Sequence, residues 1–182
     1  TGSNSTQEAI IFTEHAKSAG ADSALIVVPY YNKPSQKGLK EHYLKIADSV
    51  DLPIFIYNIP GRSVIDMSDQ TILDLSFHQN IIGIKDATND LTRPLKLKKM
   101  ISHKKFFQLS GEDETQLAYL AQGGDGVISV TANIAPNLVA TMQDEWFVGN
   151  YKEAIKINEK LSNINNLLFI ESNPSPVKYA AS

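Results

Sequence analysis

Short runs of apolar residues recur along the chain and are rich in β-branched side chains. They read ALIVVPYY, PIFIYNIP, NIIGIKDA, KFFQLSG and GVISVTAN, at residues 24–31, 53–60, 80–87, 105–111 and 126–133. Their hydrophobicity is continuous instead of alternating, which is typical of strands that are covered on both faces, as in a parallel sheet. The pattern therefore predicts five buried parallel strands.

Helical spacing of apolar residues fills the gaps between these runs. Ser35 has the character of an N-cap before an amphipathic segment that reaches Val50, and Ser68 that of a cap before a short helix to Leu75. Further helices are expected over residues 5–19, 91–101, 113–122, 136–148 and 151–170. Strands that alternate with helices form βαβ units with right-handed crossovers, so the pattern predicts a parallel α/β fold.

Two architectures satisfy this alternation, a doubly wound open sheet and a (β/α)8 barrel. A doubly wound nucleotide-binding sheet has a glycine-rich turn directly after its first strand, and the sequence contains neither G-x-G-x-x-G nor G-x-x-x-x-G-K-[ST]. The GGDG stretch at residues 123–126 precedes a strand instead of following one. We therefore favour the barrel. Because five strands do not close a barrel, we expect either a fragment that lacks its first strands or an open sheet.

Composition narrows the class of protein further. The net charge of -3 over 182 residues leaves no basic face for nucleic acid, and no apolar run approaches the roughly 20 residues that cross a bilayer. The absence of cysteine fits a reducing compartment and excludes thiolate metal sites. A cytoplasmic protein that binds neither nucleic acid nor membrane is expected.

The sequence offers no metal-binding pattern. The histidines stand singly, without metal-ligand spacing, and are expected to be surface residues: His15, His42, His78 and His103. The acidic run GEDE at residues 111–114 is interpreted as the first turn of a helix, where carboxylates are favoured by the helix dipole. We therefore expect no metal.

Lys85 ends an apolar run, where burying an unpaired ammonium is costly. Either the strand ends at Ile84 and Lys85 stands in solvent, or Lys85 is buried, its pKa falls and its amine becomes a nucleophile. Since alternate residues of a strand share a face, an inward Lys85 predicts that Gly83 and Ile81 also point inward. Ile82 and Ile84 would then face the helices.

The preceding strand places a tyrosine beside this lysine. Read in the same way, it turns Phe55 and Tyr57 inward, so that Tyr57 and Lys85 lie at the carboxyl ends of neighbouring strands, where barrel enzymes keep their active sites. Gly83 would leave open space for a small substrate. The two side chains suit imine chemistry, in which an amine attacks a ketone and a phenol transfers protons. Arg62 is either an exposed loop residue or a clamp for a carboxylate.

The motifs PYYNKPSQ, YNIPGR, GIKDAT, LSGEDE and GVISVTAN, in this order, resemble those of the dihydrodipicolinate synthase (4-hydroxy-tetrahydrodipicolinate synthase) family. The family belongs to the pyruvate-dependent class I aldolases, and the resemblance covers residues 1–182. It implies a (β/α)8 TIM barrel. Residues 1–148 would carry its last five strands, and residues 149–182 the start of a C-terminal helical region.

The resemblance also implies a lyase of lysine and diaminopimelate biosynthesis. Lys85 would form a Schiff base with pyruvate, which then adds to aspartate 4-semialdehyde, and Tyr57 would transfer protons. Arg62 would receive the carboxylate of the aldehyde, while Gly111 and Ile128 match main-chain positions that line the pyruvate pocket. No cofactor is expected, because the protonated imine is itself the electron sink.

Further positions carry implications for assembly and regulation. Tyr31 matches a residue that the family inserts into the site of a neighbouring subunit, usually within a homotetramer built as a dimer of dimers. It completes a relay whose threonine has no counterpart in the sequence. Asn4, Glu8 and Tyr30 match residues that bind lysine as a feedback inhibitor.

Two alternatives stay open at this point. A related pyruvate-dependent lyase, acting on a sialic acid or a 2-keto-3-deoxy sugar acid, would use the same lysine and tyrosine without requiring Arg62. A truncated, non-catalytic module would bind pyruvate or lysine without forming an adduct. The aspartate in GIKDAT and the presence of Arg62 favour the synthase over the sialic acid lyase.

Overall fold

The computed structural model describes residues 1–182 and contains one parallel sheet of five strands in chain order. The strands are β1 (Ala24–Val27), β2 (Ile54–Asn58), β3 (Ile81–Asp86), β4 (Phe107–Ser110) and β5 (Gly126–Val127). All four neighbouring pairs are parallel, which confirms the predicted α/β fold. Each strand is shorter than its apolar run, because the last residues of the run form the loop at the carboxyl end.

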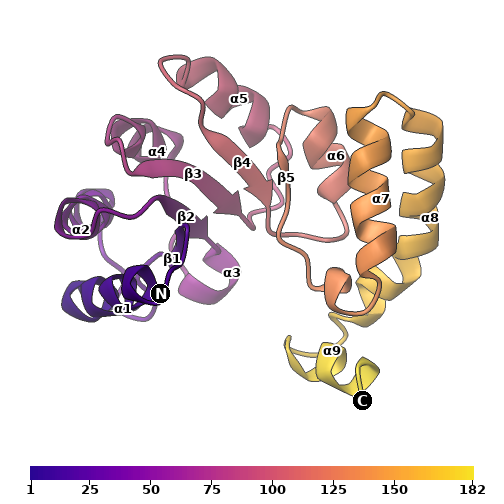
Figure 1. The fold of residues 1–182 in the computed structure, drawn as a ribbon, viewed down its shortest axis with the longest axis horizontal. Helices are drawn as coiled ribbons and strands as arrows, with labels where there is room; N and C mark the ends of the chain where they lie inside the picture. The colour runs from indigo at the N-terminus through magenta and orange to yellow at the C-terminus, as the bar shows by residue number, and fades with distance from the viewer.

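Helices connect the strands and cover the outer face of the sheet, as Figure 1 shows for α2, α4, α5 and α6. The predicted caps are confirmed, since the hydroxyls of Ser35 and Ser68 accept hydrogen bonds from the N–H groups of Gly38 and Thr71 at 3.2 Å each. No helix combines the length and apolar character needed to span a bilayer. The helices are α1 (Thr6–Ser18), α2 (Gln36–Ser49), α3 (Pro60–Ser63), α4 (Asp69–Ser76), α5 (Arg93–Met100), α6 (Gln116–Ala121), α7 (Pro136–Phe147), α8 (Tyr151–Leu167) and α9 (Ser175–Ala180), with a 3₁₀ turn η1 (Thr131–Asn133).

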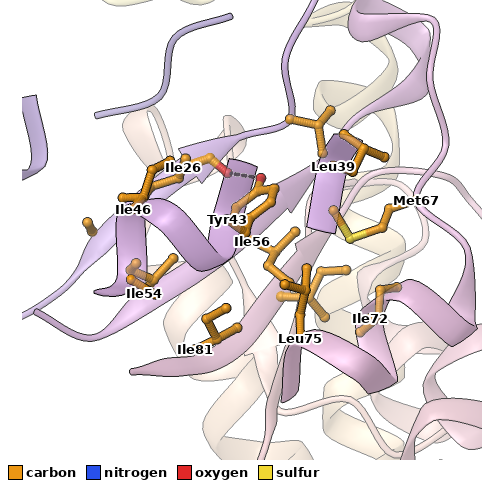
Figure 2. Packing of buried hydrophobic residues seen from close by; sticks show 14 of the residues in the cluster. Ile26, Leu39, Tyr43, Ile46, Ile54, Ile56, Met67, Ile72, Leu75 and Ile81 are labelled. Atoms are coloured by element: carbon orange, nitrogen blue, oxygen red, sulfur yellow. Dashed lines mark hydrogen bonds between the residues drawn. The ribbon is translucent and has the colours of Figure 1, made fainter. Parts of the chain in front are cut away.

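The main hydrophobic core lies between the outer face of the sheet and the helices that precede β4 (Figure 2). Ile54 and Ile56 of β2 are fully buried in it, as the alternation predicted. The buried hydroxyl of Tyr43 donates a hydrogen bond to the carbonyl of Ile26 at 2.6 Å, so it has a partner inside the core. Each aliphatic side chain buried in this way contributes about 1.5–3 kcal/mol, so this face of the sheet is firmly fixed.

A register shift in β3 overturns part of the predicted alternation. Ile54 pairs with Ile81, but the next residue of β2, Phe55, pairs with Gly83. The extra residue, Ile82, forms a bulge. Residues before the bulge therefore point to the opposite face of the sheet from the one that strict alternation predicts. Ile81 is therefore fully buried in the outer core, and Ile82 is only partly buried and lies outside that core. The prediction that Ile81 points inward and Ile82 outward was wrong.

One histidine is not a surface residue as expected. His42 is 5% exposed, and its Nδ1 lies 2.9 Å from the hydroxyl of Thr6 in α1. Helix α1 packs against α2 and covers this position, which single-helix periodicity does not reveal. No group of His, Asp and Glu side chains in the structure is arranged to hold a metal ion.

Residues after β5 are mainly helical. Helices α7 and α8 pack against each other through a second cluster, which comprises Val139, Met142, Ala154, Ile157 and Leu161. Helix α9 lies apart from this pair, below the carboxyl ends of the strands in Figure 1. The last segment of the chain is thereby brought back to the end of the sheet where Lys85 lies.

Candidate active site

Lys85 and Tyr57 are direct neighbours on the inner face of the sheet. They are paired in the β2–β3 register, and the Nζ atom of Lys85 lies 4.3 Å from the centroid of the Tyr57 ring. Both side chains are partly buried. The strand therefore continues past Ile84, and Lys85 does not extend freely into solvent. The amine and the phenol are close enough to act on one small substrate.

Burial sets the protonation of both groups. It lowers the pKa of Lys85 below its usual range, although the carboxylates of Asp113 and Glu112 oppose this effect. A lower pKa increases the fraction of free amine, which is the nucleophilic form. Burial also raises the pKa of Tyr57. The nearby charge of Arg62 opposes this increase, and the charge of Glu112 adds to it. The phenol consequently keeps its proton at neutral pH and can donate it.

Gly111 allows the end of β4 to approach the lysine closely. A methyl group added at this position would lie 3.2 Å from Cε of Lys85 and 2.7 Å from Cβ of Ala87. Any side chain would thus push against the lysine or the strand end beside it. Glycine is required at this position because the neighbouring strand end leaves no room for a Cβ atom.

Gly83 has a different effect from the one predicted. A Cβ atom there would lie 2.6 Å from the Phe55 ring and 2.5 Å from the carbonyl oxygen of Phe107. The expected open space at Gly83 is therefore filled by the Phe55 ring. The rings of Phe55 and Phe107 lie 6.2 Å apart and form an apolar floor beneath Lys85.

The open space lies instead between Lys85 and the segments that follow β5. A cavity of about 340 Å³ is bounded by Lys85, by residues 128–130 and by the residues around α9, including Asn173, Val177 and Lys178. Its size suits a small molecule. Ile128, which the family resemblance of the motifs singled out, is part of this wall and is 37% exposed.

Arg62 lies on α3, at the carboxyl end of β2, and is exposed. Its Nη2 atom donates a hydrogen bond to the carbonyl of Asn173 at 2.9 Å. Since Asn173 also lines the cavity, the guanidinium lies at the rim and its charge acts on Tyr57. A carboxylate that enters the cavity would meet this positive charge.

Asp113 is a structural element of the site that the sequence pattern did not identify. The interpretation of GEDE as the first turn of a helix was wrong for this residue, because α6 begins only at Gln116. Asp113 is 1% exposed and accepts hydrogen bonds from the N–H groups of Val130 (2.8 Å) and Thr131 (3.1 Å) and from the hydroxyl of Ser129. The one feature of the sequence that could have indicated this role is the position of Asp113 shortly after β4, the strand that neighbours β3.

The remaining candidate residues lie outside the cavity. Tyr31 is 87% exposed and has a φ of 74°. The side-chain amide of Asn4 donates to the carbonyl of Tyr30 at 3.2 Å, which brings these two residues together. Glu8 instead accepts a hydrogen bond from the hydroxyl of Ser3 at 2.7 Å.

Comparison with known proteins assigns the family. The model of the Dihydrodipicolinate synthetase family matches residues 1–182. The chain belongs to this family. It is 58% identical over 182 residues to the 4-hydroxy-tetrahydrodipicolinate synthase of Rhodospirillum centenum, with 100% of the chain and 62% of that relative covered.

Solved structures of the family agree with the fold of the chain. Dihydrodipicolinate synthase from Aquifex aeolicus superposes with a TM-score of 0.96 at 43% identity, covering 99% of the chain and 61% of that protein. The chloride-inhibited dihydrodipicolinate synthase from Acinetobacter baumannii, complexed with pyruvate, has a TM-score of 0.94 at 47% identity over 98% and 61% of the two chains. The chain thus spans about three fifths of the length of these family members.

Proposed function

We propose that the chain is the part of a 4-hydroxy-tetrahydrodipicolinate synthase that holds its Schiff-base lysine. The whole enzyme is a lyase that condenses pyruvate with aspartate 4-semialdehyde in lysine and diaminopimelate biosynthesis. The observation that carries the proposal is the partly buried amine of Lys85, 4.3 Å from the centre of the Tyr57 ring. The name of the 58% identical relative and the pyruvate complex from Acinetobacter baumannii support it.

The proposed architecture is a (β/α)8 barrel in which the five parallel strands form one continuous part of the wall. Residues 1–148 would belong to the barrel and residues 149–182 to a C-terminal helical region. All five strands lie within residues 1–148, which supports this division, and α7 packs against α8 across its boundary. In such a barrel the carboxyl ends of the strands carry the active site, where Tyr57 and Lys85 stand.

The chemistry follows from these two side chains. The neutral amine of Lys85 adds to the keto carbon of pyruvate, and Tyr57 protonates the carbinolamine oxygen, which leaves as water. The resulting protonated imine draws electrons from the methyl group, so that a methyl proton passes to the Tyr57 phenolate and an enamine forms. The enamine carbon then attacks the aldehyde carbon of the second substrate. The imine itself serves as the electron sink, so no cofactor is needed.

Other residues would orient the substrates. Arg62 would hold the carboxylate of aspartate semialdehyde at the rim, because a guanidinium binds a carboxylate through two parallel hydrogen bonds. Gly111 and Ile128 would shape the pyruvate pocket, as their places beside Lys85 and in the cavity wall suggest.

The exposed residues fit roles in an assembly. Tyr31 would enter the site of a neighbouring subunit and complete a proton relay there, in a homotetramer built as a dimer of dimers. Its 87% exposure leaves its hydroxyl available to a partner. Asn4, Glu8 and Tyr30 would form a binding site for lysine as inhibitor, and the hydrogen bond between Asn4 and Tyr30 supports this grouping.

Borohydride reduction in the presence of pyruvate tests the proposal. The full-length protein should gain a stable pyruvate adduct on Lys85, detected by mass spectrometry of the peptides, and Lys85→Ala should abolish it. Lys105→Ala is a matched control, since its amine also lies over an aromatic ring, 4.4 Å from the centroid of Phe107, but before the start of β4. This control should be trapped normally.

Two results would redirect the assignment. Binding of pyruvate or lysine without any adduct would identify a non-catalytic module. An adduct together with turnover of a sialic acid or a 2-keto-3-deoxy sugar acid, but not of aspartate semialdehyde, would identify the related lyase.

A further inference from the structure

A buried polar network lies on the outer face of the sheet, directly behind the catalytic candidates. Asn58 and Asp86 follow Tyr57 and Lys85 in sequence, so their side chains point away from the cavity. The two residues are paired in the β2–β3 register and are 0% and 3% exposed. Arg93, at the start of α5, is also buried, with 6% exposure. Three charged or polar side chains are therefore buried together behind the reacting pair.

Hydrogen bonds close this network around the two strand ends. The amide of Asn58 donates to Oδ1 of Asp86 at 3.1 Å and to Oδ1 of Asp66 at 2.7 Å. Arg93 donates from Nη1 to the same two oxygen atoms, at 3.0 Å for Asp66 and 3.3 Å for Asp86, and from Nη2 to Oδ2 of Asp66 at 3.1 Å. The carbonyl of Asn58 also accepts from the N–H of Ala87 at 2.9 Å. The ends of β2 and β3 are thus tied by main chain and side chains together.

The charge balance of the network makes Arg93 its essential member. Asp66, Asp86 and Asp69 all lie within ion-pair distance of its guanidinium, with Asp69 Oδ1 2.9 Å from Nε. Burial raises the pKa of Asp86, and the charge of Arg93 opposes this effect. Without the guanidinium, the carboxylates would repel one another or take up protons, and the strand ends would lose their common anchor. Replacing such a group leaves the buried charge of Asp86 uncompensated, so its removal disturbs the geometry around it.

We propose that Arg93 is a positioning residue for the reaction. Through Asp66 and Asp86 it holds the carboxyl ends of β2 and β3 in register, and so keeps the Tyr57 ring against the Lys85 amine. This inference rests on the proposed function. Proton transfer between phenol and carbinolamine depends on hydrogen-bond geometry, and a displacement of about 1 Å can lower a rate roughly a hundredfold. Binding of pyruvate depends less on this alignment.

Kinetics of two Arg93 variants in the full-length enzyme test the inference. Arg93→Gln should lower kcat roughly tenfold or more, while KM for pyruvate stays within about threefold of its original value, since alignment and not affinity is lost. Arg93→Lys keeps a positive charge between the carboxylates and should recover part of kcat. Ile72→Val, on the buried face of α4, controls for loss of stability and should lower Tm without changing kcat.

The outcomes separate the inference from the function on which it rests. If Arg93→Gln lowers Tm as Ile72→Val does but leaves kcat unchanged, Arg93 is only structural and the inference is wrong. If Arg93→Gln does not fold, Asp86→Asn replaces it, and a folded Asp86→Asn enzyme with unchanged kcat is equally contradictory. Absence of a pyruvate adduct in the unmodified enzyme would overturn the proposed function, and the inference with it.

Discussion

Two partly buried lysines show how the surroundings of a residue separate a chemical role from a structural one. Burial lowers the pKa of Lys104 as well as that of Lys85. The amine of Lys104, however, donates to the carbonyls of His78 at 2.8 Å and Ile81 at 2.7 Å, so it is committed to holding the chain. Lys85 has a phenol beside it and a cavity in front of it. A lowered pKa alone would therefore not distinguish them, whereas the surroundings of each amine do.

His42 is expected to make stability fall in mildly acidic solution. Burial lowers its pKa from 6.5 to about 4, so the unfolded chain binds a proton at a higher pH than the folded chain. The contribution is complete above pH 6.5 and is lost as the pH falls towards 4, by up to about 3 kcal/mol. Urea unfolding between pH 4.5 and 8 measures this loss.

The variant His42→Asn serves as the reference for this titration. It keeps a polar group for Thr6 but removes the titrating ring, so its stability should depend less on pH over the same range. Carboxyl groups titrate equally in both proteins and cancel in the difference. Identical slopes for the two proteins would mean that His42 is not protonated on unfolding.

At the scale of elements, the site is assembled from loops that other elements hold in place. The cavity wall formed by residues 128–130 is a loop, because β5 ends at Val127. Its shape comes from Asp113, which binds two N–H groups and a hydroxyl of this loop. Asn165 of α8 adds a bond from its amide to the Asp113 carbonyl at 3.1 Å. Helix α8 thus supports the wall opposite Lys85 through its bond to Asp113.

Asp113→Asn is expected to destabilise the protein by about 2 kcal/mol or more. The amide that replaces one oxygen presents a donor to groups that are themselves donors, and hydrogen bonds to a charged acceptor are lost. The altered loop should also raise KM for pyruvate. Thermal unfolding and steady-state kinetics measure both effects.

The neighbouring acid provides the comparison for this variant. Glu114 is exposed, and Glu114→Gln removes the same charge from the same turn. It should change stability by less than about 0.5 kcal/mol. If the two variants behaved alike, the charge of the GEDE run and not the hydrogen bonds of Asp113 would be responsible.

At the scale of the whole molecule, Tyr31 has an exposed ring and a strained backbone that no contact within the chain accounts for. It is the middle residue of a tight turn, in which the N–H of Asn32 donates to the carbonyl of Tyr30 at 2.9 Å. A tyrosine with a φ of 74° is strained, and strain of this kind is concentrated at functional sites. Its exposed ring is consistent with the proposed role in a partner subunit.

Mixing two inactive enzymes tests this role. Lys85→Ala subunits lack the amine, and Tyr31→Phe subunits lack the donated hydroxyl, so each homo-oligomer should be nearly inactive. In a mixed dimer one site receives Lys85 from one subunit and Tyr31 from the other. After subunit exchange at equal concentrations, about one quarter of all sites should be active.

Controls make the complementation interpretable. Each variant mixed with itself should gain no activity, and sedimentation should confirm that the mixed species are oligomers of the original size. If Tyr31→Phe alone were fully active, or if mixing restored nothing while hetero-oligomers formed, Tyr31 would not cross to a partner site.

The sequence alone determined the succession of elements and the pair of side chains that is proposed to react. Continuous apolar runs fix parallel strands, and serine caps fix where α2 and α4 begin, because these effects act over a few residues. Since strand alternation is also local, it correctly set Tyr57 beside Lys85 and turned Ile54 and Ile56 to the helices.

Tertiary structure decided what depends on contacts between distant segments. The bulge at Ile82 arises from pairing with β2, and the space at Gly83 is filled by a ring from another strand. The burial of His42 depends on α1, and the role of Asp113 on a loop more than fifteen residues away, as the Ser129 and Val130 bonds record. Such features reflect the packing of whole elements. A local pattern of polar and apolar residues carries no information about which distant segment packs against it.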